Sequence, residues 1–267
     1  MIILSAVTAI ICLKNNRIKE ETMTETKFFA GLNDRSHFSR DELLNSFRAG
    51  GYTLSSASFY KKVQEMLKAG EIIRVGRNVY CLPSEEKAIY EHLYSALSLE
   101  IADILIENYP YMDFSIFELV QLNDFVNHQI AHNVIYLSVD PEVTDFVFDT
   151  LKERYPGKVL LNPSVEFYHQ YWTDNMIVLG KLITEAPKGQ QAAWHTKLEK
   201  MLVDIMSEPL IQASVGESEY PTIYEDAFMR YLVDEGCMFR YAKRRNADKK
   251  IRKLICEKTN IELHTKG

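Results

Sequence analysis

The sequence predicts an α+β protein, with an N-terminal winged helix-turn-helix followed by an α/β domain that has a helical C-terminal subdomain. Three observations predict this class. The segment 37–83 has the pattern of two short amphipathic helices and a hairpin, the segment 98–183 alternates helical and strand patterns, and the segment from about 191 to 267 returns to helical spacing. The composition, with 46% hydrophobic and 25% charged residues, is ordinary for a globular protein.

The first 22 residues are expected to lie outside the fold. They open with a largely apolar stretch of 13 residues, shorter than the roughly 20 that a membrane-spanning helix needs. Lys14 follows this stretch, whereas a secretory signal carries its basic residue in front. We therefore expect an N-terminal extension over 1–22, with Met23 as the true start, a winged domain over 23–83 and a second domain over 84–267.

Two helices are expected at the start of the winged domain. The first covers about 20–32, and its apolar face consists of Phe28, Phe29 and Leu32. For the second, Ser39 is a suitable N-cap, because Glu42 follows three residues later and completes a capping box. Gly50 and Gly51 end this helix, and its buried stripe consists of Leu43, Leu44 and Phe47.

The next helix and a hairpin complete the predicted winged unit. Ser55 or Ser56 caps the helix and Gly70 ends it, and its inward face consists of Phe59, Val63, Met66 and Leu67. The segments 72–75 and 78–82 are then expected to pair around the turn residues Gly76 and Arg77.

In helix-turn-helix proteins the N-terminal half of the second helix enters the major groove, which makes this unit a candidate DNA interface. Serine hydroxyls contact phosphates or base edges, and lysines act mainly on phosphate or guanine. Cations on the wing reach the backbone or the minor groove. The expected DNA-binding residues are Ser56, Ser58, Tyr60, Lys61, Lys62, Arg74 and Arg77. The alternative is that the winged unit contacts protein and that its lysines are ordinary solvated surface.

The chain has a net charge of −6, but two of its segments, 23–83 and 240–253, are basic. Between residues 23 and 83, nine Lys and Arg oppose six Asp and Glu, which gives a charge of +3, whereas 84–239 is strongly acidic. The segment 240–253 then carries eight cations against Asp248 alone. On one helix Arg245 and Lys249 would share a face with Arg252 or Lys253. We expect either a solvated helix or a second phosphate-binding patch, consisting of Arg240, Lys243, Arg244, Arg245, Lys249, Lys250, Arg252 and Lys253.

The second domain is expected to follow a linker at 83–87. Strand patterns cover 112–117, 133–139, 158–161 and 176–183, and helical patterns cover 98–108, 141–154, 190–208, 223–234 and 247–258. The aromatic residues Phe167, Tyr168, Tyr171 and Trp172 are expected to lie in the core.

Nothing in the sequence predicts an enzyme, a metal site or a cofactor. The four cysteines, Cys12, Cys81, Cys237 and Cys256, have no CxxC spacing, which favours buried free thiols in a reducing, cytoplasmic compartment. His128 and His132 have a spacing that binds metal on a helix, but no adjacent glutamate or evident third ligand accompanies them. Phosphate-binding, nucleophile-elbow and nuclease motifs are absent, and the numerous acids are expected on solvated faces.

Two stretches together resemble the AbiEi-type antitoxins of bacterial toxin–antitoxin systems. The first is the winged unit, which ends in GRNVYCLP. The second joins the helix pattern LEK-x-LVD, at 198–204, to a Tyr-Ala-x-Arg segment at 241–244. The segment 113–125 also looks like the family's aromatic segment. The resemblance covers about residue 38 to the end, and its motifs are structural rather than catalytic.

The resemblance implies a DNA-binding transcriptional regulator, the antitoxin of a toxin–antitoxin pair, that represses its own operon. It also implies a functional partner, a nucleotidyltransferase-type toxin, without requiring a stable complex. Because operators of helix-turn-helix proteins are commonly repeats, we expect two protomers on double-stranded DNA of its own promoter. The alternatives are a winged-helix adaptor that binds protein, and a metal-dependent hydrolase or nuclease in the C-terminal domain.

Overall fold

The computed structural model describes residues 31–32, 37–76, 78–82 and 87–265. The chain forms two compact units, Met1–Ser84 and Glu85–Gly267, and both helices and strands build the α+β architecture that the sequence predicts. Most of the helix expected over 20–32 lies outside the described residues. Among the helices of the described ranges, none is long and apolar enough to cross a membrane.

The N-terminal unit combines two helices with a small antiparallel sheet. The chain order is β1 (Phe38–Ser39), α2 (Arg40–Ala49), α3 (Ser56–Ala69), β2 (Ile73–Gly76) and β3 (Val79–Cys81). Both β1 and β2 pair with β3, so the strand order is β1-β3-β2. Helices and sheet enclose one core, formed by Leu32, Phe38, Leu43, Phe47, Phe59, Val63, Met66, Ile72 and Tyr80.

The ends of these two helices confirm the predicted capping. Ser39 Oγ accepts from the backbone N–H of Glu42 at 3.2 Å, and the carboxylate of Glu42 accepts from the backbone N–H of Ser39 at 2.7 Å. Ser55 caps α3 by accepting from the N–H of Ser58 at 3.2 Å. Gly70 ends α3 with φ at 72°, the left-handed conformation that glycine adopts without steric strain.

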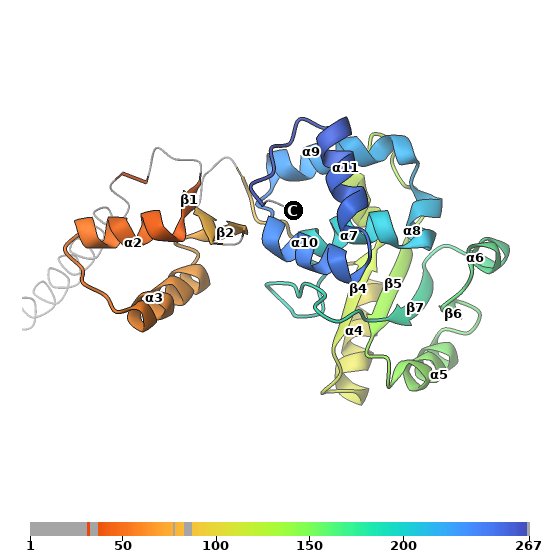
Figure 1. The fold of residues 1–267 in the computed structure, drawn as a ribbon. Coiled ribbons are helices and arrows are strands. Elements are labelled where there is room, and N and C mark those ends of the chain that lie inside the picture. The colour runs from red at the N-terminus through yellow and green to blue at the C-terminus, as the bar shows by residue number, and fades with distance from the viewer. Residues whose placement is uncertain (1–30, 33–36, 77, 83–86, 266–267) are drawn as a thin grey trace, which may run out of the picture. The chain divides into compact units, whose positions relative to one another are not determined.

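The C-terminal unit is built on a four-stranded sheet of order β4-β5-β7-β6 (Figure 1). Its strands are β4 (Phe114–Glu118), β5 (Val134–Val139), β6 (Val159–Leu161) and β7 (Met176–Lys181). β4 is antiparallel to β5, whereas β5, β7 and β6 run parallel. The helices are α4 (Ala96–Asn108), α5 (Thr144–Arg154), α6 (Val165–Tyr171), α7 (Leu198–Ser207), α8 (Pro209–Ser214), α9 (Tyr220–Arg230), α10 (Glu235–Arg244) and α11 (Asp248–Lys258).

Apolar side chains cover both faces of this sheet. Ile135, Leu137 and Val139 alternate with Val134 and Tyr136 along β5, so they point to opposite faces. The first face packs on α4 and α5. The second packs in the larger core with α7, α9, α10 and α11. Parallel strands that are buried on both faces give the near-continuous apolar runs seen in the sequence.

The helix expected over 190–208 is wrong in its first half, because α7 begins only at Leu198. The preceding residues lie along β4 instead. The carbonyl of Trp194 accepts from the N–H of Ile116 at 3.0 Å, and Thr196 Oγ1 donates to the carbonyl of Ile116 at 2.6 Å. Backbone groups at a sheet edge need partners when they are buried, and this need overrides the helical pattern of Ala192 and Ala193.

The helix expected over 223–234 ends earlier than predicted, at Arg230. Tyr231 then forms a parallel bridge with Ala88, and the N–H of Leu232 donates to the carbonyl of Ala88 at 3.0 Å. A partner distant in sequence therefore ends this helix, and no local stop signal marks the position.

Candidate functional site

The exposed side of α3 carries residues that the sequence predicts to contact DNA. Ser56, Ser58 and Tyr60 are exposed, with Tyr60 57% accessible. Lys61 is exposed and Lys62 half-buried. The ammonium of Lys61 lies 3.9 Å from the carboxylate of Glu65, and both side chains face solvent. Such exposed ion pairs contribute little to stability, so Lys61 remains free to bind another group. This face of α3 therefore presents hydroxyls, a phenol and two ammonium groups.

Arg40, at the start of α2, is a cation of this surface that the sequence prediction omitted. Its guanidinium lies 5.6 Å from the ring centre of Phe59 and 6.0 Å from that of Tyr60, within the range of cation–π attraction. The signal available in the sequence was its place directly after the N-cap Ser39. This contact sets a third positive charge beside the N-terminal half of α3.

Of the two hairpin cations expected to contact DNA, the structure describes only Arg74. Arg74 is half-buried on β2, where it stands opposite Tyr80 of β3. Arg77 lies outside the described residues. The pairing slips by one residue between Arg74 and Gly76, and Asn78 adopts φ of 58°, so the predicted hairpin is present with an irregular turn.

The second basic patch does not occupy one helix face, contrary to expectation. The chain turns between α10 and α11, where Asn246 adopts φ of 53°. Arg245 points inward, donating to Ser207 Oγ at 3.0 Å and to the carboxylate of Glu208 at 2.9 Å. Partners also engage three further cations. Arg244 pairs with Glu185, Lys250 donates to the carbonyl of Met206, and Arg252 stacks on Phe239 and pairs with Asp248.

Four cations of this segment are exposed and make no hydrogen bond or ion pair within the described part of the chain, although Arg240 lies near Glu185. They are Arg240, Lys243, Lys249 and Lys253. The remaining cations join separate elements. Arg245 and Lys250 reach α7, Arg244 reaches the loop residue Glu185, and Arg252 of α11 stacks on Phe239 of α10. A phosphate-binding surface here would therefore have four charges distributed over two helices, half of the eight that the sequence suggested.

His128 and His132, whose spacing would suit metal binding on a helix but for which no metal site was expected, lie in a loop. His128 Nδ1 is 2.8 Å from the carboxylate of Glu219, and His132 Nδ1 is 3.7 Å from that of Asp174. The two histidines thus pair with different acids. Within the described ranges, no group of three His, Cys, Asp or Glu side chains could hold a metal ion.

Two expectations about burial are wrong. Only Tyr168 of the aromatic set lies in the core, whereas Phe167, Tyr171 and Trp172 are exposed. The short helix α6 lies at the side of the unit and buries a single aromatic residue. Among the cysteines of the described ranges, Cys256 is exposed rather than buried.

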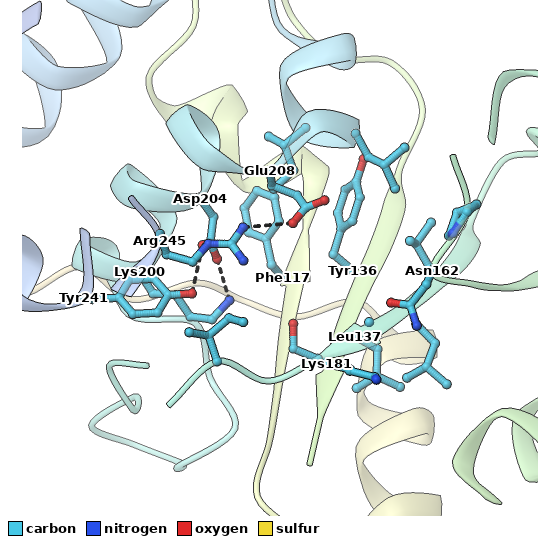
Figure 2. A pocket seen from close by; sticks show the side chains of 18 residues that line it. Phe117, Tyr136, Leu137, Asn162, Lys181, Lys200, Asp204, Glu208, Tyr241 and Arg245 are labelled. Carbon is cyan, nitrogen blue, oxygen red and sulfur yellow. Dashed lines mark hydrogen bonds and ion pairs between the residues drawn. The ribbon is translucent and has the colours of Figure 1, made fainter. Parts of the chain in front are cut away.

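The structure brings the two motifs LEK-x-LVD and Tyr-Ala-x-Arg into contact across α7 and α10 (Figure 2). Asp204 accepts from Lys200 Nζ at 2.6 Å and from the Tyr241 hydroxyl at 3.0 Å. The guanidinium of Arg245 lies 3.5 Å from the same carboxylate. Lys200, Asp204 and Tyr241 are all buried, so this network is internal and joins the two helices.

This network forms one wall of a cavity of about 440 Å³ in the C-terminal unit. The opposite wall is the face of the sheet that carries Phe117, Tyr136 and Val178, and Leu210 and Ile211 of α8 close one side. Figure 2 shows Asn162 across the cavity from Lys200 and Asp204, with the rings of Phe117 and Tyr136 between them. Sequence reasoning missed this cavity, because its lining comes from segments far apart in the chain.

A buried carboxylate, Glu118, lies at the end of β4. It accepts hydrogen bonds from His92 Nε2 at 2.7 Å, from Ser98 Oγ at 2.7 Å and from Asn133 Nδ2 at 3.3 Å, and a further one from the hydroxyl of Ser95, the N-cap of α4. Burial raises the pKa of the Glu118 carboxyl, but these hydrogen bonds outweigh burial and lower the pKa to about 2.

We expect Glu118 to make the C-terminal unit sensitive to acid. Its pKa in the folded protein lies below the ordinary value of 4.5. Its contribution to stability is therefore present above pH 4.5 and disappears as the pH falls towards about 2. Urea unfolding at several pH values would test this. Glu118→Gln should flatten the pH dependence in this window, and an unchanged dependence would contradict the assignment.

Comparisons with known proteins give a family but no activity. The family of unknown function DUF6577 matches residues 38–261. Among curated proteins, none matches the chain. A crystal structure of the RV2827C protein from Mycobacterium tuberculosis is similar at 11% sequence identity, covering 90% of this chain and 83% of that one, with a TM-score of 0.23. A likeness of this size carries no argument about function.

Proposed function

Since the chain belongs to DUF6577, a family of unknown function, we propose its function from its own residues: it is a DNA-binding transcriptional regulator whose N-terminal unit is a winged helix-turn-helix. The observation that carries the proposal is the exposed N-terminal half of α3, where Ser56, Ser58, Tyr60, Lys61 and Lys62 lie together. These side chains are the hydrogen-bond donors and cations that contact phosphates and base edges.

In this proposal α3 is the recognition helix and the β2–β3 hairpin is the wing. Helix-turn-helix proteins insert the second helix of the pair into the major groove, and α2 with α3 supplies such a pair. Arg40 adds a charge beside α3 through its stacking on Tyr60. Arg74 and Arg77 are the proposed contacts of the wing with the DNA backbone or minor groove.

The regulator would act as the antitoxin of a toxin–antitoxin pair and repress its own operon. Support for this step is the resemblance carried by LEK-x-LVD and Tyr-Ala-x-Arg, whose residues Asp204 and Tyr241 share a hydrogen bond. A nucleotidyltransferase-type toxin is the proposed functional partner, with no stable complex required. Two protomers per operator would supply positive charge that the single unit, at +3 over residues 23–83, lacks.

A fluorescence-anisotropy titration of the full chain tests the proposal. The labelled duplex is the DNA upstream of its own gene, a scrambled duplex is the competitor, and salt is varied from low to physiological concentration. We expect binding that resists the competitor and weakens as salt rises, because phosphate contacts release counterions. Absence of binding at either salt would overturn the proposal and favour the adaptor, in which the same surface of α3 contacts protein.

A further inference from the structure

The cavity of the C-terminal unit lies where parallel sheets commonly bind small molecules. Asn162 directly follows β6 and Lys181 is the last residue of β7, and both line the cavity. Ligands of open α/β sheets bind outside the carboxyl ends of parallel strands. A volume of about 440 Å³ also falls within the roughly 300–1,000 Å³ of small-molecule pockets.

Besides the network that joins α7 and α10, the polar side chains of Tyr136, Asn162 and Lys181 line the cavity. The hydroxyl of Tyr136 is buried without a hydrogen bond of normal length to a described residue, and Ser214 and Tyr168 are its neighbours. Within the described ranges, no hydrogen bond or ion pair engages the side-chain amide of Asn162 or the ammonium of Lys181, and both residues are exposed. Asn162 holds φ of 41°, a strained backbone conformation that asparagine tolerates better than most residues. The side chains of Asn162 and Lys181 are therefore available to a ligand at the mouth of the cavity.

The charges around the cavity favour an anion. Lys181, Lys200 and Arg245 contribute three positive charges, and Asp204 and Glu208 two negative ones, which leaves +1. Lys200 pairs with Asp204, and Arg245 with Glu208. The excess charge therefore belongs to Lys181, at the mouth of the cavity.

The remaining lining favours a flat, apolar body. The rings of Phe117 and Tyr136 stack with their centres 5.8 Å apart and their planes 28° apart. Val178, Leu210 and Ile211 complete this part of the wall. Gly180 lines the cavity as well, and a Cβ there would lie 3.6 Å from Asn162 Oδ1, so the absence of a side chain leaves room at the mouth.

We propose that this cavity binds a small aromatic anion, with its carboxylate or phosphate beside Lys181 and Asn162 and its ring against Phe117 and Tyr136. The site goes beyond DNA binding and belongs to the other unit of the chain. If the chain is a regulator, the ligand is an effector that acts through the C-terminal unit. The binding test below involves no DNA, so its outcome is independent of the proposed function.

The test is a titration of the full chain with benzoate, phenyl phosphate and benzamide, followed by the backbone amide signals of Gly180 and Lys181 in NMR spectra. Benzoate and phenyl phosphate distinguish the two head groups, and benzamide has the shape of benzoate without its charge. We expect at least one anion to bind with a dissociation constant below about 1 mM, a reasonable affinity for so few atoms, and benzamide to bind at least roughly tenfold more weakly.

Lys181→Gln is expected to weaken binding of the anion roughly tenfold, because a charge-assisted contact is lost. Lys158→Gln is the matched control, since Lys158 is exposed at the opposite end of β6, and it should bind as the unaltered chain does. Three results would each overturn the proposal. They are equal affinity for benzamide and benzoate, equal affinity of the Lys181→Gln variant and the unaltered chain for the anion, and no saturable shift of the amide signals with either anion at about 10 mM.

Discussion

Replacing Asp204 by alanine is expected to lower the free energy of unfolding of the C-terminal unit by about 3–5 kcal/mol, the effect typical of removing one partner of a buried ion pair. The carboxylate accepts from Lys200 and Tyr241 and lies beside Arg245. Without it, the ammonium of Lys200, whose side chain is 5% exposed, loses the carboxylate with which it pairs at 2.6 Å. Desolvation of that charge is then uncompensated, and α7 and α10 lose their polar link.

Tryptophan fluorescence during urea unfolding measures this loss selectively. The chain has 2 tryptophans, Trp172 and Trp194, and both belong to the C-terminal unit. Asp149→Ala on α5 is the control, because Asp149 is exposed, and exposed substitutions usually change stability by less than about 0.5 kcal/mol. If both variants unfold at the same urea concentration, the network does not stabilise the unit.

A double variant separates the lost charge from the lost packing. Lys200→Met with Asp204→Leu removes both charges and keeps apolar volume between α7 and the sheet. Replacement of a buried ion pair by apolar residues is often neutral or stabilising. We therefore expect the double variant to be more stable than Asp204→Ala. Equal loss in both would show that the shape of Asp204, rather than its charge, is what the site requires.

Replacing Lys61 and Lys62 together by alanine is expected to weaken DNA binding for all sequences alike and to reduce the salt dependence of the affinity. Each lysine that neutralises a phosphate adds about 0.9 to the slope of log K against log salt, so the double variant should lose roughly one to two units. Discrimination between the operator and the scrambled duplex should change little, because phosphate contacts carry no sequence information.

The matched control carries the same change of charge outside the proposed interface. Lys152 and Lys158 are exposed in the C-terminal unit, and replacing both by alanine should leave the salt slope unaltered. An unchanged slope in the Lys61 and Lys62 variant would remove these lysines from the interface. A loss of equal size in the control would show that total charge, and not the face of α3, governs the affinity.

Short-range signals predicted much of the fold. The capping box of Ser39 and Glu42, the cap at Ser55 and the left-handed Gly70 each depend on residues within a few positions. The strand patterns at 133–139 and 176–183 succeeded because burial on both faces leaves a continuous apolar run. These features can be predicted from sequence because each depends on its immediate neighbours.

Distant partners explain where the predictions failed. Trp194 and Thr196 follow the edge of β4 rather than a helix because Ile116 supplies their hydrogen-bond partners. Acids expected on solvated faces are buried where a distant donor compensates them, as in Glu118 with His92 and Asp204 with Tyr241. No spacing within the sequence encodes such pairs.

The sequence by itself determined the strands of the C-terminal sheet, the caps of the N-terminal helices and the cations on α3, because these follow from local propensity and periodicity. Only the tertiary structure decided which of those elements meet. It turned Arg245 inward to Glu208, separated the partners of His128 and His132, and placed Asn162 and Lys181 at one cavity. The physical reason is that buried charges and polar groups take the partners that packing brings within reach, and packing joins residues that the sequence keeps apart.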